Sequence, residues 1–322
     1  MISRISLKGT HVGKAFFSTG AVRDKVVVFG GHGTHMVGMG KQFLKYDWSK
    51  EFLKQCDERL GLPITKYMTE GPEDELNKTE IAQPAIFINS YLLFQKALIQ
   101  GTLKEEEIEF VIGHSLGEYL ALTVSESFVP LDAIKFLHER AKLVQDCCKG
   151  KNVGMIVVLG DYDQLELEMK AIELQFPDKM CDIAAFNSPN QFILTGELEV
   201  LLPLQEELQL RGIKTFRVNA RAAFHSHLLT QMRGKLKDML EDMNIFNPKY
   251  RIIRNCDTEE YCEKQDIIEG LVEQLDNPVL FHQMVEKIRS YGDYKFIEAG
   301  SNGNMPTILR SISRDINVVS LR

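Results

Sequence analysis

The sequence lacks the long apolar segments of a membrane protein. No run of it approaches the roughly 18 consecutive apolar residues that a transmembrane helix requires. It also lacks an excess of basic residues, and the formal net charge of −7 argues against a nucleic-acid-binding surface. Six cysteines are few for 322 residues, and they form neither a metal-ligand spacing nor a dense disulfide framework. We therefore expect reduced thiols in a non-secretory compartment.

The composition is that of an ordinary globular protein, with 44% hydrophobic and 26% charged residues. A chain of this length can form one large α/β domain, or a large and a small domain that each bury a core.

The first 23 residues differ from the rest of the chain. They carry four lysines and arginines together with several serines and threonines, and the first acidic residue is Asp24. This composition is typical of an organellar import presequence, and we expect a mitochondrial one that is removed after about residue 18 to 24. The alternative is an ordinary basic N-terminus, because Gly9 and Gly13 weaken the amphipathic helix that import requires. The predicted location is the mitochondrial matrix.

The most informative segment is Gly-His-Ser-Leu-Gly at 113–117, which follows an apolar run and precedes a helical pattern. A serine between two glycines on a tight strand-to-helix turn indicates a nucleophile elbow, whose strained backbone leaves the hydroxyl exposed. The N–H groups at the start of the helix point to the same place, where they can stabilise an oxyanion formed from a thioester or ester. The pattern predicts that Ser115 is a nucleophile, and the alternative is a glycine-rich turn with an idle serine.

Strand-like and helical segments alternate along most of the chain, beginning with an apolar strand at 25–29 that ends in a glycine-rich turn. This alternation predicts a parallel sheet covered by helices on both faces. Between 153 and 219 the order becomes strand-helix-strand-strand-helix-strand, which is typical of a ferredoxin-like domain. Further strands are expected near 250–254, 295–297 and 318–321.

The predicted fold class is α/β, with an α/β-hydrolase-like parallel-sheet large domain and an inserted ferredoxin-like (βαββαβ) small domain. Residues 1–23 are the expected presequence. Residues 24–152 and 220–322 are expected to form the catalytic domain, and residues 153–219 the small domain.

A serine nucleophile needs a base, and Ala-Phe-His-Ser-His at 223–227 follows the last strand of the expected small domain. That position would return a histidine to the main sheet near the elbow. We predict that His225 takes the proton of Ser115 as general base. His227 is the alternative base, because it shares a face with His225 if the segment is extended.

Eight segments occur in an order that resembles the malonyl-CoA:acyl carrier protein transacylase family, which includes the acyltransferase domains of fatty-acid and polyketide synthases. The resemblance runs from about residue 25 to 312. The segments are Phe-Gly-Gly-His-Gly-Thr-His-Met-Val-Gly-Met-Gly at 29–40, Gly-Pro-Glu-Asp-Glu-Leu-Asn-Lys-Thr at 71–79, Ala-Gln-Pro-Ala at 82–85, Gly-His-Ser-Leu-Gly-Glu-Tyr at 113–119, Glu-Arg-Ala-Lys-Leu at 139–143, Phe-Asn-Ser-Pro at 186–189, Ala-Phe-His-Ser at 223–226 and Asp-Asn-Pro-Val at 276–279.

The resemblance implies a role for three of these residues in particular. Ser115 would attack the malonyl thioester with His225 as its base, and the acyl-serine would divide one transfer between two thiols into two displacements, which is ping-pong chemistry. Arg140 would bind the free malonyl carboxylate through a bidentate contact that an acetyl group cannot make. The alternative for Arg140 is an ordinary solvated arginine on a helix.

The resemblance also assigns the supporting groups. The oxyanion hole would use the backbone N–H groups of Leu116 and His32. A main-chain carbonyl at Asn277 would orient the histidine. The remaining substrate-binding residues would be Gln83, Asn187 and His114, with a turn or cap role as the alternative for Gln83 and Asn187.

Two departures from the family pattern are visible. His32 stands where the family usually has glutamine in the first turn, which a main-chain donor tolerates. Gly-Ser-Asn-Gly at 300–303 replaces the usual Gly-Pro-Gly, which leaves the shape of that loop open.

The resemblance further implies that malonyl-CoA is the donor and acyl carrier protein the acceptor, for fatty acid synthesis, with no bound cofactor and no metal. We expect no nucleic-acid partner, no membrane span and a monomer.

Two alternatives come from other classes. A serine esterase or thioesterase would normally place an acid between Ser and His and has no use for a buried arginine in an apolar acyl pocket. A carrier-binding scaffold without catalysis is disfavoured by the intact Ser115–His225 pair.

Overall fold

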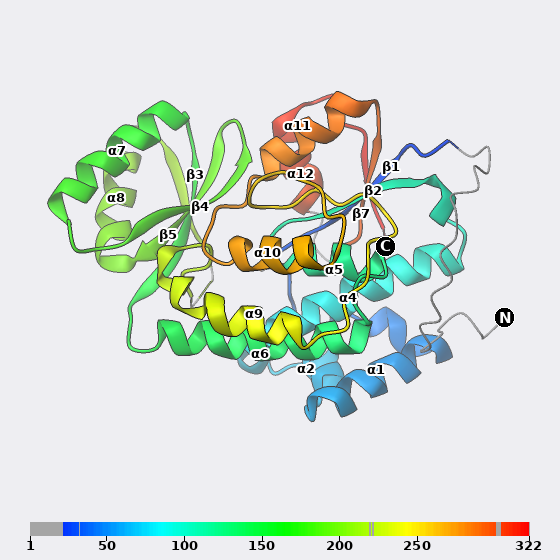
Figure 1. The fold of residues 1–322 in the computed structure, drawn as a ribbon. Helices are drawn as coiled ribbons and strands as arrows, with labels where there is room; N and C mark the ends of the chain where they lie inside the picture. The colour runs from blue at the N-terminus through cyan, green and yellow to red at the C-terminus, as the bar shows by residue number, and fades with distance from the viewer. Residues whose placement is uncertain (1–21, 32, 219, 221, 301–303, 322) are drawn as a thin grey trace.

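The computed structural model describes residues 22–31, 33–218, 220, 222–300 and 304–321. Two four-stranded sheets lie side by side, each with helices packed against it (Figure 1). Within the described ranges, no helix combines the length and the apolar character needed to cross a membrane. The expected presequence, except for its last two residues, and His32 lie outside the described residues.

The first sheet is parallel throughout and has the strand order β2-β1-β7-β8. Its strands are β1 (Lys25–Phe29), β2 (Ile108–Gly113), β7 (Lys295–Glu298) and β8 (Val318–Ser320). The last four residues of β1 are completely buried, as expected for a strand covered on both faces. Because the strands are parallel, the turns that follow Phe29 and Gly113 meet at the same edge of the sheet.

Alternate residues of β1 enter two different cores. Val27 and Phe29 pack on the face that carries α4, whereas Val26 and Val28 pack on the opposite face with α11 and α12. The helices of this part are α1 (Asp47–Leu60), α2 (Ile64–Glu70), α3 (Glu73–Leu76), α4 (Thr79–Ile99), α5 (Leu116–Val124), α6 (Pro130–Cys148), α9 (Arg233–Glu241), α10 (Lys264–Gln274), α11 (Phe281–Tyr291) and α12 (Asn304–Ile312), with short 3-10 helices η1 (Lys41–Lys45), η2 (Glu105–Glu107) and η3 (His227–Met232).

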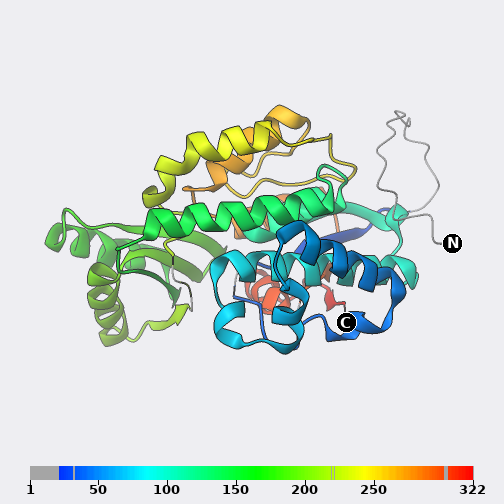
Figure 2. The same ribbon diagram turned by 90° about the horizontal axis from the view of Figure 1, so that it is seen from below.

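Helix α6 spans much of the molecule, with α9 on one side and α1 and α4 on the other (Figure 2). Helix α5, which begins directly after the predicted nucleophile, is buried along its whole length. A buried helix of this kind gives the elbow a rigid support.

The second sheet is antiparallel throughout and has the strand order β4-β5-β3-β6. Its elements follow one another along the chain as β3 (Val153–Leu159), α7 (Tyr162–Gln175), β4 (Cys181–Ser188), β5 (Gln191–Glu197), α8 (Leu198–Leu210) and β6 (Lys214–Val218). This is the order of elements that the sequence predicts. Both helices contribute apolar side chains to a separate core with the sheet.

The chain after α10 joins the two sheets. Val279 donates its N–H to the carbonyl of Ala184 at 2.9 Å and accepts the N–H of Phe186 at 2.9 Å. The predicted site therefore lies where β4 meets the carboxyl edge of the first sheet.

The strand expected at 250–254 is not formed as such. Arg251 makes a single parallel bridge to Phe110, and its main chain exchanges hydrogen bonds with Val111 and Glu109 of β2. The ladder ends there because the chain turns inward and places Asn255 against the elbow.

Candidate active site

Ser115 lies on the turn between β2 and α5, with φ 54° and ψ −109°. Two glycines allow this turn. A Cβ atom on Gly113 would lie 1.9 Å from the main chain of Gly117, and one on Gly117 would lie 2.4 Å from the carbonyl oxygen of Phe29. The strained serine and the close approach of β1 are those of a nucleophile elbow.

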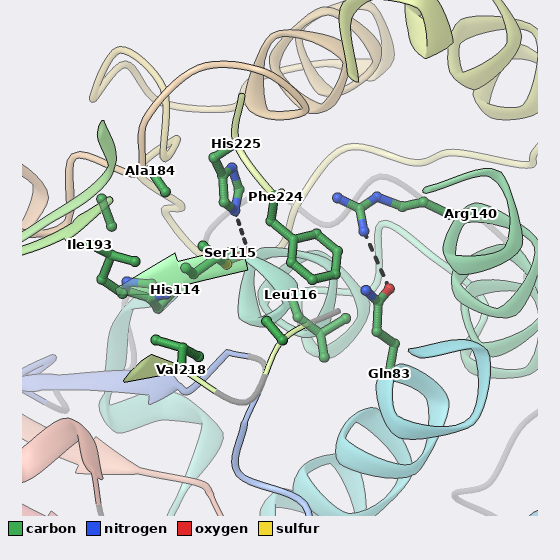
Figure 3. Close-up of a pocket in the computed structure, with 13 residues that line it drawn as sticks. Gln83, His114, Ser115, Leu116, Arg140, Ala184, Ile193, Val218, Phe224 and His225 are labelled. Carbon is green, nitrogen blue, oxygen red and sulfur yellow. Dashed lines mark hydrogen bonds between the residues drawn. The ribbon is translucent and has the colours of Figure 1, made fainter. Parts of the chain in front are cut away.

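His225 faces the serine hydroxyl, with Nε2 2.6 Å from Ser115 Oγ (Figure 3). Its other ring nitrogen, Nδ1, donates to the main-chain carbonyl of Gln274 at 2.8 Å. A carbonyl can only accept, so Nδ1 carries the proton and Nε2 of the neutral ring is left to accept from the serine. The arrangement is a dyad with a main-chain carbonyl in the place of a carboxylate.

The carbonyl that orients His225 is thus that of Gln274, and the prediction that Asn277 provides this hydrogen bond is corrected. The main chain of Asn277 has a smaller effect in the same direction as Gln274, since it also raises the pKa of the histidine. Helix α10 ends at Gln274, and the residue four positions later is Pro278, which has no N–H to occupy the carbonyl. Proline therefore leaves this oxygen free for the histidine.

Burial holds His225 in its neutral form. Loss of solvation is the largest influence and lowers its pKa to about 3; the hydrogen bond to Gln274 opposes this, and the nearby charge of Arg140 reinforces it. The ring is consequently neutral above about pH 4, with Nε2 unprotonated.

His227, the alternative base, is directed elsewhere. Its side chain is 81% exposed, and Nδ1 lies 2.9 Å from Asp182 Oδ1 on β4. The two histidines diverge because the chain is extended at Ser226 and then enters η3, which begins at His227.

A buried polar network lies behind the elbow. Asn255 accepts the N–H of Ser115 at 2.7 Å and donates to the carbonyl of Gly113 at 2.8 Å. The side chain of Gln274 donates to the carbonyl of Ser115 at 2.9 Å. Glu118 in turn accepts from both Asn255 and Gln274.

Sequence reasoning missed three residues of this network: Asn255, Gln274 and Glu118. Glu118 had a visible signal, because an acidic residue in the first turn of a buried helix needs partners. Asn255 and Gln274 had none, since each lies more than 100 positions from the serine and is brought to it only by tertiary folding.

The serine opens into a cavity of about 70 Å³ at the junction of the two sheets. Its lining is mainly apolar apart from Gln83, His114, Ser115, Arg140 and His225. Figure 3 shows Arg140 and Gln83 on one side of this cavity, with Ser115, His225 and His114 across it.

Arg140 extends from α6 into the cavity and is 3% exposed. Its Nη1 donates to Gln83 Oε1 at 3.3 Å, and its guanidinium carbon lies 5.3 Å from the ring centroid of Tyr119. In the described part of the chain no carboxylate pairs with it, and Nε has no hydrogen-bond partner. A buried guanidinium with unused donors is suited to bind an anionic group of a ligand.

Leu116, Gln83 and His114 line the cavity. Asn187 is next to it, and its role in substrate binding stays a prediction. Asn187 holds His114 through a 2.7 Å contact between Oδ1 and Nε2. The carbonyl of Asn277 is displaced by that of Gln274, as described above.

The oxyanion donors are only partly described. The N–H of Leu116 has no acceptor among the described residues and stands in the first turn of α5. His32 lies outside the described residues, but a Cβ on its neighbour Gly31 would lie 2.8 Å from the carbonyl of His114. The first glycine-rich turn is therefore packed directly against the elbow.

A serine on an elbow, a neutral histidine at its hydroxyl and a cavity that contains a buried arginine define an α/β enzyme of the serine–histidine dyad class. The acyl transferase domain family matches residues 26–315, and the chain belongs to this family.

Relatives agree with this assignment. The malonyl CoA-acyl carrier protein transacylase of Bacillus subtilis is 27% identical over 298 residues, which cover 91% of this chain and 92% of that protein. The crystal structure of the transacylase of the same name from Clostridium perfringens is 31% identical, with a TM-score of 0.83 and coverage of 92% of each chain. The predicted resemblance to the malonyl-CoA:acyl carrier protein transacylases is confirmed.

A further structure shows a malonyl-transacylase in complex with a type II PKS acyl-carrier protein. It is 25% identical, with a TM-score of 0.86, and the match covers 92% of this chain and 95% of that one. The transacylase from Coxiella burnetii, at 23% identity and a TM-score of 0.87 over 93% of this chain and 94% of that one, shares the fold.

Proposed function

We propose that this protein transfers a malonyl group from malonyl-CoA to the phosphopantetheine thiol of acyl carrier protein through an acyl-serine intermediate. The observation that carries this proposal is the buried Arg140, which has no carboxylate partner in the described chain and shares a cavity with Ser115 and His225. The malonyl CoA-acyl carrier protein transacylases that match over more than nine tenths of this chain support the substrate assignment.

The first half-reaction forms the acyl-enzyme. Ser115 Oγ attacks the thioester carbonyl while its proton passes to Nε2 of His225, 2.6 Å away. The oxyanion would receive hydrogen bonds from the main-chain N–H groups of Leu116 and His32. As the carbon–sulfur bond breaks, the proton on Nε2 passes to the departing thiolate of CoA.

The second half-reaction reverses these steps with a different thiol. His225 takes the proton of the phosphopantetheine thiol, the sulfur attacks the malonyl-serine, and Ser115 recovers its proton as the ester bond breaks. One histidine serves as base and acid in both halves, and burial keeps its ring neutral, with Nε2 free, before each half begins.

Arg140 selects the acyl group. A malonyl carboxylate would give its guanidinium the charged partner that the described chain does not supply, and Gln83 would hold the guanidinium in place. Acyl groups without a carboxylate would leave this buried charge unpaired.

The fold and the setting complete the proposal. We infer an α/β-hydrolase-like catalytic domain of residues 24–152 and 220–322, with a ferredoxin-like small domain of residues 153–219. The strand order and directions of the two sheets support this inference. The protein would act as a monomer in the mitochondrial matrix after removal of a basic presequence.

The test compares transfer with hydrolysis. Purified protein is incubated with malonyl-CoA, with and without phosphopantetheinylated acyl carrier protein, and malonyl-carrier and free malonate are both measured by mass spectrometry. Malonyl-carrier should accumulate much faster than malonate, because the cavity is mainly apolar and a thiol replaces water as acceptor. Malonate as the main product would instead identify a thioesterase.

A further inference from the structure

Glu118 is a buried carboxylate that the proposed reaction steps do not use. It lies three residues after Ser115 on α5 and is 0% exposed. Among the described residues, its hydrogen-bond donors are all neutral groups that come from other segments of the chain. A buried charge of this kind needs every one of its acceptor sites to be filled.

Each oxygen of Glu118 has a defined partner. Oε1 accepts the N–H of Asn255 at 3.0 Å and the hydroxyl of Tyr261 at 2.9 Å. Oε2 accepts Nε2 of Gln274 at 2.9 Å. One carboxylate therefore joins α5, the segment that follows the bridge at Arg251, and the end of α10.

Two of these partners hold the main chain of the nucleophile. Asn255 accepts the N–H of Ser115, and Gln274 donates to its carbonyl. Gln274 also presents the main-chain carbonyl that orients His225. The position of the nucleophile and the orientation of the base thus depend on two residues that share a single carboxylate.

We propose that Glu118 is a positioning residue, whose carboxylate fixes Asn255 and Gln274 and so keeps Ser115 Oγ aligned with Nε2 of His225. The inference rests on the proposed function only in taking Ser115 as the nucleophile. A glutamine cannot replace this group, because all three partners are donors and its NH₂ would meet a donor.

The protonation of Glu118 gives the proposal a signature. Burial raises its pKa to about 7, while the three hydrogen bonds and the charge of Arg254 act in the opposite direction. The other titratable groups that act on it are Cys256, Tyr261 and Tyr119. The pKa of Cys256 is raised to about 12, and burial also raises the pKa of Tyr261 and of Tyr119. None of these changes charge between about pH 6 and pH 8.

The protonated carboxyl would lose one acceptor position and loosen its hold on the network. Alignment should therefore weaken as the pH falls through about 7. His225 cannot produce this change, because burial lowers its own pKa to about 3.

The experiment measures the rate at which a fluorophosphonate probe labels Ser115, which reports nucleophile alignment without malonyl-CoA. Glu118→Gln should label about ten- to a hundredfold more slowly than wild type. The control is Glu168→Gln, a buried carboxylate on α7 that pairs with Arg211 at 2.8 Å and lies outside the network. It should label at the wild-type rate.

The pH profile separates positioning from a general structural role. Wild-type labelling should fall as the pH is lowered through about 7, and Glu118→Gln should lack this limb. Tyr261→Phe removes one hydrogen bond that lowers the pKa of Glu118, so its limb should move to higher pH. This conservative variant decides the matter even if Glu118→Gln does not fold.

An unchanged rate and an unchanged limb in Glu118→Gln, or an unmoved limb in Tyr261→Phe, would overturn the proposal. Normal probe labelling without any acylation by malonyl-CoA would contradict the proposed function and leave the positioning role intact.

Discussion

Arg140 is the residue on which acyl selectivity depends in this account. It is buried, it donates a hydrogen bond to Gln83, and its Nε has no partner among the described residues. Such a group is unfavourable in the free enzyme and becomes favourable when a carboxylate binds. Selectivity then follows from desolvation of one charge rather than from the shape of the pocket.

Arg140→Ala should reduce malonyl transfer by about 2–5 kcal/mol in transition-state stabilisation, since a buried charge partner is lost. Acetyl transfer should be unchanged or faster, because the unpaired guanidinium disappears with the mutation. Rates with malonyl-CoA and acetyl-CoA on both proteins measure this. Lys142→Ala, on the exposed side of the same helix, is the control and should alter neither rate. Equal losses for both substrates would make Arg140 a structural residue.

His225→Ala should slow acylation of Ser115 by about 10²–10⁴-fold, as expected when a general base is removed. His227→Ala is the matched control, because that side chain is exposed and pairs with Asp182. Quenched-flow mass spectrometry gives both rates. A larger loss in His227→Ala would mean that the wrong histidine has been assigned as base.

His225 also makes stability depend on pH. Burial is the main reason that its pKa falls from the ordinary value of 6.5 to about 3 in the folded protein, so between these values the unfolded chain binds the extra proton. Unfolding free energy should therefore fall as the pH is lowered from about 6.5 toward 3, and His225→Gln should lose less of it than wild type. Urea unfolding at pH 7 and pH 5 tests this difference; parallel losses in the two proteins would contradict it.

The sequence predicts Ser115, His225 and Arg140 as site residues because each lies in a short local motif, and the structure brings all three to one cavity. Ser115 is marked by its flanking glycines, and His225 and Arg140 by ordered family segments. Gln274 was not predictable, since its carbonyl is free only because α10 ends there and Pro278 follows. Every residue has a main-chain carbonyl, so the residue type at 274 does not indicate that this one accepts a hydrogen bond from His225.

The elbow is the place where the strands β1 and β2 meet the start of helix α5, with their main chains in close contact. The carbonyl of Phe29 approaches Gly117 so closely that no side chain fits. The strain at Ser115 is thus maintained by packing of a buried helix against the central strand.

Gly117→Ala should destabilise the protein by about 2–4 kcal/mol, because its Cβ would lie 2.4 Å from the carbonyl oxygen of Phe29. Gly234→Ala is the matched control, since a Cβ there meets nothing within 4 Å and the residue lies in α9. That variant should gain about 0.5 kcal/mol from helix propensity. Chemical denaturation measures both, and similar effects at the two positions would show that the elbow is less tightly packed than described.

The elements themselves were largely predictable, because apolar runs and helical periodicity are local properties. The order strand-helix-strand-strand-helix-strand from Val153 to Val218 is the one observed. The strand expected at 250–254 is reduced to a single bridge. Its apolar residues are buried beside β2, but the main chain then turns away and brings Asn255 to the elbow.

At the scale of the whole molecule, the site belongs to neither sheet alone. Ser115 lies on the turn that follows β2 of the first sheet, and Met155, Ala184, Ala185, Ile193 and Val218 of the second sheet close the cavity. No local sequence pattern predicts this junction, since the hydrogen bonds between Val279 and β4 join segments that lie far apart in the chain. The acyl pocket is a product of the assembly of the two.

The N-terminal segment predicts where this molecule works. Residues 1–24 fused to a fluorescent reporter should direct it to mitochondria, because the segment is basic and has no acidic residue before Asp24. The control exchanges Arg4 and Lys8 for glutamate, which should leave the reporter in the cytosol. Cytosolic or plastid fluorescence from the unaltered fusion would contradict the prediction.

In the proposed reaction, Ser115 carries the malonyl group from one thiol to another. Wild-type protein and Ser115→Ala are mixed with malonyl-CoA, quenched, and analysed by intact mass spectrometry before and after addition of phosphopantetheinylated acyl carrier protein. We predict a malonyl adduct on wild type alone, which disappears from the enzyme as malonyl-carrier forms. An adduct of equal extent on Ser115→Ala, or a wild-type adduct that the carrier cannot discharge, would contradict the account.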